Sequence, residues 1–402
     1  MIAPAPGGCR NPVPLPPPWG MMFKVAAPST TGGTARGSRA RWVSGMADGT
    51  GWRGRRVLVT GGAGFLGSAL CHALGAAGAE TVALDAMLPG TGARRANLDG
   101  SGARLVVADL RDAALAPLLD GVDVLFNMAG QTSHAGSQKD PFGDLAINGH
   151  AQLRLIAALR ERAPGAVVVH ASTRQFYGRP QWLPVDESHP IVPPDANGVS
   201  KFAAEGYWLL EHRVHGRPVT ALRLTNCYGP RMRVMDARQT FLGIWIRRLL
   251  EGEAFEVWGG DQLRDFSYAD DAVAAFLTAA ESLLAGRGDG GGGAAGRPFN
   301  LGGDAPMALR DLAAALVEAG GGGHYVSREF PADRAAIDIG SYHADDRAFR
   351  ALTGWAPRVG LAEGLRRTVD WFRPRMAEYA TEDGAEDHPE VRAANREGAL
   401  VR

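Results

Sequence analysis

The stretch Arg56-Val57-Leu58-Val59-Thr60-Gly61-Gly62-Ala63-Gly64-Phe65-Leu66-Gly67 decides the fold of this chain. It opens with a short run of β-branched and apolar residues, typical of a buried strand, and a helical pattern follows the glycines up to Gly78. Gly61, Gly64 and Gly67 lack a Cβ, which permits a tight turn, close approach of a diphosphate, and packing of the helix on the strand. The N-terminus of that helix then faces the diphosphate. Strand, glycine turn and helix in this order predict a dinucleotide site.

A carboxylate stands where such a site needs one. A second short strand, residues 81–84, ends on Asp85, which follows Gly67 by 18 positions. At that strand end a carboxylate can accept hydrogen bonds from both hydroxyls of an adenosine ribose, and it would repel a 2′-phosphate. The sequence therefore favours NAD over NADP, and the nearby Arg94 and Arg95 weaken this preference only slightly.

Strands and helices continue to alternate further along the chain. Strands are predicted at 105–108, 122–127 and 166–170, and a long helix at 197–215. This alternation predicts an α/β fold with a doubly wound parallel sheet, the Rossmann arrangement, and a smaller C-terminal lobe that binds substrate. We expect an NAD-binding domain at 51–225, with return segments near 260–285, and a mainly substrate-binding lobe at 226–374.

Both ends of the chain differ in composition from the part between them. Residues 1–50 are rich in Pro, Gly, Ala and Arg and predict a disordered extension, because they bury too little apolar surface to offset their ordering entropy. The alternatives are an over-long start with Met46 as the first residue, or a transit peptide; a signal peptide is excluded, because no apolar core is present. Residues 375–402 predict a flexible tail, and the glycine-rich stretch 286–296 predicts a flexible surface loop.

The composition excludes several kinds of partner. The formal net charge is zero, so nothing in it favours nucleic acid or an anionic membrane. No apolar run approaches the roughly 18 residues of a membrane-spanning helix. Cys9, Cys71 and Cys227 are far apart and odd in number, and His212 and His215 have no ligand partners at metal-binding spacing. We therefore expect a cytoplasmic protein without a metal site.

From about residue 55 to 372 the sequence resembles the extended short-chain dehydrogenases/reductases, specifically their NAD-dependent sugar-nucleotide epimerases and dehydratases. The matching segments follow in one order: 60–67, 109–112, 127–130, 172–178, 222–230, 264–266 with 270–271, and 354–357. The resemblance implies NAD as cofactor, a nucleotide sugar as substrate, and a homodimer formed through the lysine-bearing helix and the helix before it. The apolar surface of this dimer interface would come from two segments, Tyr207-Trp208-Leu209-Leu210 and Leu153-Arg154-Leu155-Ile156. The alternative is that these residues face the sheet.

The resemblance also implies the ligand contacts. Around the cofactor it places Gly61, Gly64, Phe65, Leu66, Gly67, Asp85, Asp109, Leu110, Ala129 and Lys201, with Asp109 and Leu110 flanking the adenine. Around the substrate it places Gln175, Asn226, Arg264 and Arg334, the last three on the nucleotide diphosphate. For Arg264 an ion pair with Asp261 or Asp265 is the alternative.

The catalytic centre departs from the family. There a tyrosine precedes the lysine by four residues, so both reach one helix face; here the lysine is Lys201, and Asn197 stands at the tyrosine position. An amide can orient a hydroxyl or a water, but it does not titrate near neutral pH. Thr173 lies at the position where members of the family carry a serine or threonine that is hydrogen-bonded to the reacting oxygen. The proton acceptor stays open among Tyr177, His134 and a water held by Asn197 and Lys201.

The neighbours of Thr173 bear on the reaction. Dehydratases of the family carry Asp and Glu in the two following positions, and decarboxylases carry a glutamate there, whereas this chain has Arg174 and Gln175. Epimerisation through a transient keto sugar needs neither carboxylate, and we expect that reaction. The alternatives are a protein that binds NAD and a sugar nucleotide without redox turnover, because of Asn197, or a dehydratase or decarboxylase of the same family.

Overall fold

The computed structural model describes residues 51–236, 241–286, 293–303, 305–331 and 338–381. Several sequence predictions therefore concern residues outside the described part. These are the extension at 1–50, most of the glycine-rich loop, Arg334, and the tail from residue 382 onward.

A seven-stranded sheet forms the centre of the described chain, in the order β11-β6-β5-β4-β1-β2-β3. All of its pairings are parallel. Its strands are β1 (Arg56–Thr60), β2 (Glu80–Asp85), β3 (Arg104–Val107), β4 (Val124–Asn127), β5 (Val167–Thr173), β6 (Val219–Leu224) and β11 (Pro298–Leu301). The central strands are nearly continuous apolar runs because both faces of the sheet are covered. The predicted doubly wound parallel sheet is confirmed.

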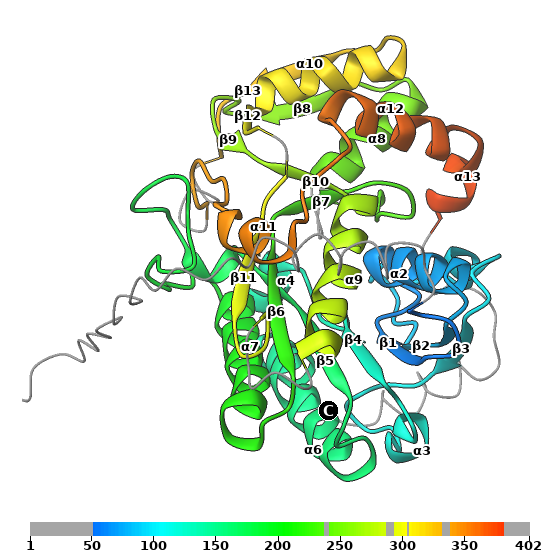
Figure 1. Ribbon diagram of the computed structural model, residues 1–402. Coiled ribbons are helices and arrows are strands. Elements are labelled where there is room, and N and C mark those ends of the chain that lie inside the picture. Colours follow the sequence, from blue (N-terminus) through cyan, green and yellow to red (C-terminus); the bar gives the residue numbers. More distant parts are fainter. Residues whose placement is uncertain (1–50, 237–240, 287–292, 304, 332–337, 382–402) are drawn as a thin grey trace, which may run out of the picture. The chain divides into compact units, whose positions relative to one another are not determined.

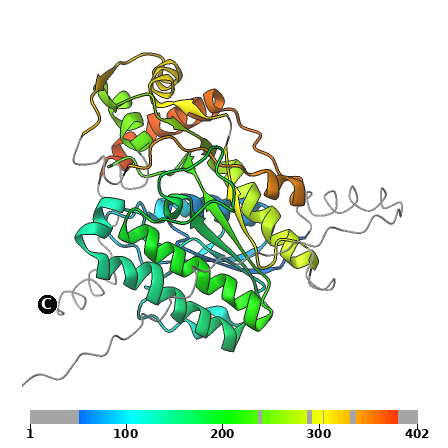
Figure 2. The same cartoon turned by 90° about the vertical axis from the view of Figure 1, so that its left-hand side faces the viewer.

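Helices cover both faces of this sheet (Figures 1 and 2). On one face lie α2 (Phe65–Ala76), α9 (Ala269–Ala285) and α11 (Arg347–Thr353), which bury Leu70, Phe276 and Phe349. On the other lie α3 (Ala116–Leu119), α6 (Ala151–Arg162) and α7 (Ala196–His215), which bury Leu159 and Trp208. The short helices α4 (His134–Lys139) and α5 (Pro141–Leu145) and a π-helical segment η2 (Ala146–His150) pack against α7.

A smaller lobe has its own hydrophobic core, built around Trp245, Phe255, Leu365 and Phe372. Its elements are β7 (Asn226–Tyr228) paired with β10 (Phe266–Tyr268), β9 (Leu263–Arg264) paired with β12 (Met307–Ala308), β8 (Phe255–Trp258) paired with β13 (Tyr325–Arg328), and the helices α8 (Phe241–Glu251), α10 (Leu309–Gly320) and α12 (Leu361–Phe372). Figure 1 shows α8, α10 and α12 together beyond one end of the sheet.

The end of the described chain differs from the sequence prediction of a tail from residue 375. A short helix, α13 (Met376–Tyr379), continues the fold, and Tyr379 is buried with its hydroxyl donating to Oδ1 of Asn97. The Arg94 guanidinium lies over the Tyr379 ring and donates to the carbonyls of Glu378 and Thr381, at 3.3 and 2.6 Å. One aromatic anchor produces no apolar periodicity, so the sequence pattern did not reveal it.

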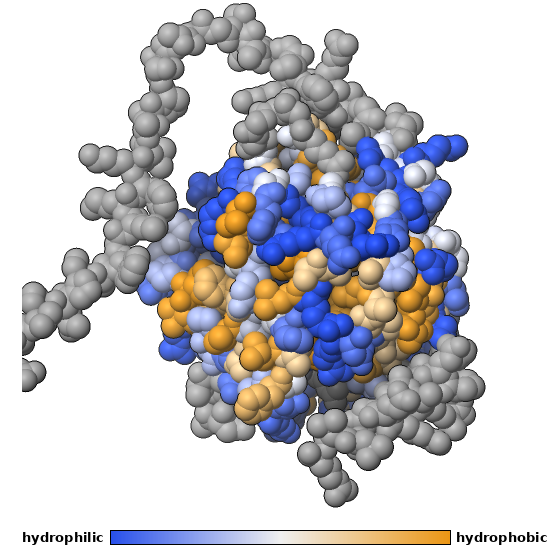
Figure 3. Space-filling view, turned by 90° about the horizontal axis from the view of Figure 1, so that it is seen from below, coloured by the Kyte–Doolittle hydropathy of each residue, from blue (hydrophilic) through white to orange (hydrophobic). Residues whose placement is uncertain are grey.

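An apolar surface runs along α5, α6 and α7. Leu145, Leu153, Val199, Phe202 and Tyr207 are all exposed there. Trp208, Leu155 and Ile156, which were predicted to supply the same surface, pack instead into the core against the sheet. On the face seen in Figure 3, apolar side chains gather in several places among hydrophilic ones. Within the part of the chain that is described, no helix is both long and apolar enough to cross a membrane.

Candidate functional site

A cavity of about 330 Å³ lies at the carboxyl ends of the central strands. Its walls include the glycine turn, the end of β2 at Asp85, and the ends of β4 and β5. The strand order reverses here, because β1 has β2 on one side and β4 on the other. Open α/β sheets bind their ligands at such a switch point.

The floor of the cavity is built from backbone. Gly61 has φ +65°, a left-handed conformation that favours glycine, and a Cβ on Gly67 would lie 2.1 Å from the Gly61 carbonyl oxygen. Helix α2 begins at Phe65, and its N-cap residue, Gly64, provides no side-chain cap; its first turn holds no acidic residue. Its first N–H groups can therefore meet an anion, so a dinucleotide diphosphate fits this floor.

The predicted cofactor residues surround this one cavity: Gly61, Gly64, Phe65, Leu66, Gly67, Asp85, Asp109, Leu110, Ala129 and Lys201 all line it. The Asp85 carboxylate is fixed by the N–H groups of Ala63 and Met87, at 3.1 and 2.9 Å, and burial raises its pKa above the ordinary value. Arg94, one of the two arginines that slightly weakened the preference for NAD, is occupied by the chain end around Tyr379.

Four of the predicted catalytic residues line the same cavity: Thr173, Asn197, Lys201 and His134. Lys201 lies one turn after Asn197 on α7. Burial lowers the pKa of Lys201 to about 8, an effect that the nearby Asp144 opposes. No described residue accepts a hydrogen bond from the Lys201 ammonium, so this group remains available to a ligand. Thr173 accepts from the Gln175 backbone N–H at 3.1 Å.

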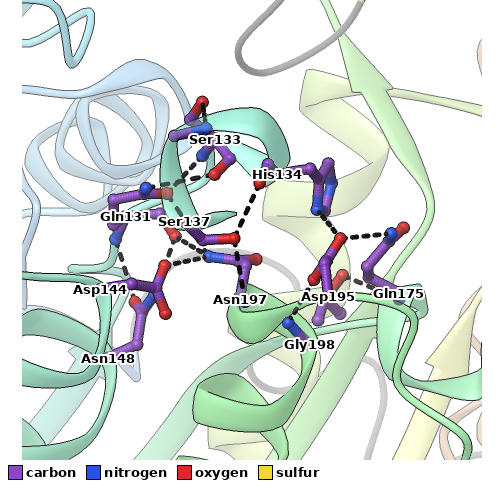
Figure 4. Close-up of polar contacts among 12 residues, drawn as sticks. Gln131, Ser133, His134, Ser137, Asp144, Asn148, Gln175, Asp195, Asn197 and Gly198 are labelled. Atoms are coloured by element: carbon purple, nitrogen blue, oxygen red, sulfur yellow. Dashed lines mark hydrogen bonds and ion pairs between the residues drawn. The ribbon is translucent and has the colours of Figure 1, made fainter. Parts of the chain in front are cut away.

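Asn197 is held by a network of acceptors (Figure 4). Its Nδ2 donates to the Gln131 carbonyl at 3.0 Å and to Oδ2 of Asp144 at 2.9 Å. Asn148 donates to the same Asp144 oxygen at 3.1 Å and accepts from the Gln131 N–H at 3.0 Å. Since only acceptors surround Nδ2, the amide orientation is fixed. Asp144 and Asn148 were missed from the sequence, although their spacing of one helical turn could have indicated a shared face.

A second missed residue, Asp195, lies beside His134. Oδ2 of Asp195 is 2.9 Å from Nδ1 of His134 and accepts from Nε2 of Gln175 at 3.0 Å. Its Oδ1 accepts from the Gly198 N–H at 2.7 Å and so caps α7. Burial alone would raise the pKa of Asp195, but these contacts outweigh it and hold the pKa below its ordinary value. An aspartate just before a helix indicates an N-cap, and that was the available signal.

Tyr177 lies elsewhere, which corrects its candidacy as proton acceptor. It is fully buried, does not line the cavity, and donates to Oδ1 of Asn300 at 2.8 Å while accepting from Arg223. Burial raises the pKa of Tyr177 to about 12. This phenol is therefore a structural group of the core.

The described residues that were predicted to hold the substrate, Gln175, Asn226 and Arg264, do not line this cavity. Arg264 donates to the carbonyls of Leu263 and Gly340 and pairs with Asp338 at 3.4 Å. The alternative partner Asp261 pairs with Arg310 instead. Asn226 donates to the Asp265 carbonyl at 3.1 Å and accepts from Arg174 at 3.2 Å, while Gln175 is bound to Asp195.

No group of three His, Cys, Asp or Glu side chains among the described residues could hold a metal ion. Cys227 lines the cavity, but burial raises the pKa of its thiol to about 12, so it stays protonated.

Known proteins share this architecture. A family model described as "NAD dependent epimerase/dehydratase family" matches residues 57–302. The UDP-glucose 4-epimerase of Mycolicibacterium smegmatis is 32% identical over 79% of this chain and 98% of its own length. The dTDP-glucose 4,6-dehydratase of Streptomyces niveus is 30% identical over 80% of this chain and 94% of its own.

Solved structures agree with the sequence comparison. The UDP-glucose 4-epimerase of Thermus thermophilus, determined in complex with NAD, superposes with a TM-score of 0.68 at 29% identity. The match covers 80% of this chain and 99% of that one. With the glycine turn and Asp85 at one cavity, these similarities show that the chain belongs to the NAD-dependent epimerase/dehydratase family.

Proposed function

We propose that this protein is an NAD-dependent epimerase that acts on a nucleotide-activated sugar through a transient keto intermediate. One observation carries the proposal: a single cavity joins the dinucleotide floor and Asp85 to Thr173 and Lys201. NAD, when bound, supplies an acceptor that takes a hydride from a sugar carbon and returns it. The names of the relatives, UDP-glucose 4-epimerase and dTDP-glucose 4,6-dehydratase, support a nucleotide sugar as the substrate.

The chain's own residues would bind and orient the reactants. Gly61 to Gly67 would hold the diphosphate of the cofactor, and Asp85 its adenosine ribose. Lys201 would donate to a ribose or sugar oxygen, because it lines the cavity and its ammonium has no acceptor among the described residues. Thr173 would position the reacting hydroxyl, since its own hydroxyl stands at the end of β5 in the same cavity wall.

Arg174 and Gln175 favour epimerisation over dehydration. Loss of water from a keto sugar needs an acid and a base beside the leaving hydroxyl. The Gln175 amide is bound to Asp195, and the Arg174 guanidinium lies 4.7 Å from the centre of the Tyr342 ring and donates to Asn226. Neither side chain can exchange a proton at neutral pH.

The test is direct. The purified protein is incubated with UDP-, dTDP-, CDP- and GDP-sugars, and the sugar stereochemistry is followed by NMR. Inversion at one ring carbon with no net change of NAD supports the proposal. Unchanged stereochemistry in every mixture would contradict it for those substrates.

Asn197 favours a second candidate function, binding of NAD and a sugar nucleotide without redox turnover. It carries no titrating proton where the family has a phenol. Exchange of deuterium at a sugar carbon, or transient reduction of the cofactor, would exclude this candidate.

We further propose a homodimer formed through the exposed apolar side chains of α5, α6 and α7. Val199 and Phe202 lie on α7, and Leu145 and Leu153 lie on the neighbouring elements. Sedimentation of the wild type should give a dimer mass, and Phe202→Glu should give monomers, with Val192→Glu on a loop as the control. A Phe202→Glu variant that sediments as the wild type would contradict this interface. The expected cytoplasmic location is supported by the composition and the cysteines alone.

A further inference from the structure

The proposed epimerisation requires a proton acceptor that Asn197 does not provide, and the present inference rests on that proposed function. When hydride leaves a carbinol carbon, its hydroxyl proton must move to another group. Asn197 is 1% exposed, and its Nδ2 is committed to Gln131 and Asp144. The acceptor therefore has to be another group at the cavity.

We propose that His134, held by Asp195, takes and returns the proton of the reacting hydroxyl. The His134 side chain is 39% exposed and lines the same cavity as Thr173 and Lys201. Its Nδ1, in contrast, is inaccessible and lies 2.9 Å from Oδ2 of Asp195, at ion-pair distance but not in hydrogen-bond alignment. With the proton of the neutral imidazole on Nδ1, Nε2 carries the free lone pair.

Asp195 is built to keep the imidazole in that form. Its side chain is completely inaccessible, and two further donors, Gly198 and Gln175, fix both carboxylate oxygens. The carboxylate cannot turn away, so it selects the tautomer with Nδ1 protonated and stabilises the imidazolium that forms during reaction. Because Asp195 caps α7, the same helix end positions Asn197 and Lys201.

Other titratable groups near His134 are less suited to this role. Helix α4 packs against α5 and α7, which present Asp144 and Lys201, and Asp195 stands at the start of α7. Asp144 does not line the cavity, and one of its oxygens already accepts from Asn197 and Asn148. Lys201 is an ammonium below its pKa of about 8, so it donates rather than accepts.

The proton and hydride balance closes without another reactant. The O–H bond of the sugar hydroxyl breaks and an N–H bond forms at Nε2 of His134. The C–H bond of the same carbon breaks, hydride passes to NAD, and C–O becomes C=O. In the reverse direction hydride returns to the opposite face of the carbonyl, and Nε2 gives the proton back to the oxygen.

The experiment compares the wild type with His134→Gln, with His150→Gln as the matched control on an exposed histidine of η2. Cofactor reduction is followed in single turnovers by nicotinamide absorbance, with NAD affinity measured in parallel. We expect His134→Gln to slow hydride transfer by about 10²–10⁴-fold, the usual contribution of a general base, with NAD affinity unchanged.

Asp195 is a positioning residue and needs a separate variant. Asp195→Ser keeps an N-cap hydroxyl for α7 but removes the carboxylate. It should slow hydride transfer in the wild-type background and add no further slowing in the His134→Gln background, while denaturant unfolding confirms that the variant is folded. Equal slowing in both backgrounds would mean that Asp195 only caps the helix, which would overturn its part in the proposal.

The outcomes separate the two proposals. If the wild type turns over and His134→Gln retains its rate of hydride transfer, the assignment of His134 is overturned and the proposed function stands. If the wild type itself neither reduces its cofactor nor inverts any sugar, both are overturned.

Discussion

Replacement of Asp85 by asparagine perturbs the contact that selects the cofactor. The native carboxylate lines the cavity at the end of β2, and its two oxygens each accept one backbone N–H, from Met87 and from Ala63. A carboxylate offers about four lone-pair sites, so about two remain for the two hydroxyls of the adenosine ribose. Asparagine keeps one oxygen and turns an NH₂ group toward the Ala63 N–H or toward the ribose.

The expected loss follows from that count. Hydrogen bonds to a charged group contribute about 1.5–3 kcal/mol each, and Asp85→Asn removes the charge and at least one ribose bond. A total near 3 kcal/mol corresponds to NAD binding weakened by about 100-fold. Burial raises the pKa of Asp85, so in the wild type NAD affinity should also fall as acid protonates this acceptor, at higher pH than for an ordinary aspartate.

Isothermal calorimetry with NAD measures the effect on protein freed of bound cofactor. Asp112→Asn, an exposed aspartate on the loop after β3, is the matched control and should bind as the wild type. An affinity of Asp85→Asn within about threefold of the wild type would refute the reasoning, because it corresponds to less than one ribose hydrogen bond.

Three further predictions concern the catalytic helix and the chain end. Burial lowers the pKa of Lys201 from 10.5 to about 8. Between pH 8 and 10.5 the unfolded chain therefore binds more protons than the native state, so the free energy of unfolding should rise with pH in this range. Lys201→Met should flatten that rise in denaturant unfolding, whereas Lys139→Met, at an exposed site, should not. Asn197→Tyr removes two hydrogen bonds, from Nδ2 to the Gln131 carbonyl and to Asp144, at a cost of about 1–3 kcal/mol in total, although Asn148 still donates to both acceptors. With His134 as the acceptor of the proton, Asn197→Tyr should bring little gain in turnover; a large gain would contradict that assignment. Tyr379→Phe loses the hydrogen bond to Asn97 and should lower the free energy of unfolding by about 1 kcal/mol, with Tyr325→Phe as control; an unchanged value would show that the hydroxyl adds nothing.

The cofactor half of the site could be predicted from the sequence because its determinants are local. The glycine turn, the strand before it and the helix after it are continuous in the chain, and Asp85 is placed by the end of the next strand. A parallel sheet brings such strand ends to one edge whatever the distant parts of the chain do. The predicted set therefore meets at one cavity.

The reacting half could be predicted only in part. Lys201 and Asn197 share a helix face, which their spacing gives, but the approach of α4 and α5 to α7 depends on packing between helices. Asp195 and Asp144 acquire their roles from that packing, and local patterns could indicate only an N-cap at Asp195 and a shared helix face for Asp144 and Asn148. Tyr177 shows the converse, because its segment matches the family while the side chain turns into the core toward Arg223 and Asn300.

The substrate-binding residues are harder still to predict from the sequence, because they come from connections of irregular length. Arg264 lies in the two-residue strand β9 and meets Asp338 and Gly340 from far along the chain. Neither contact has a period or a spacing that a sequence reveals.

The most direct test of the central claim, that this cavity holds NAD for hydride transfer, is mass spectrometry of the small molecules released when the purified protein is denatured. The account predicts that NAD or its reduced form is released, and that calorimetry of the stripped protein shows NAD binding again. Well-folded protein that releases no dinucleotide and shows no affinity for NAD would contradict it.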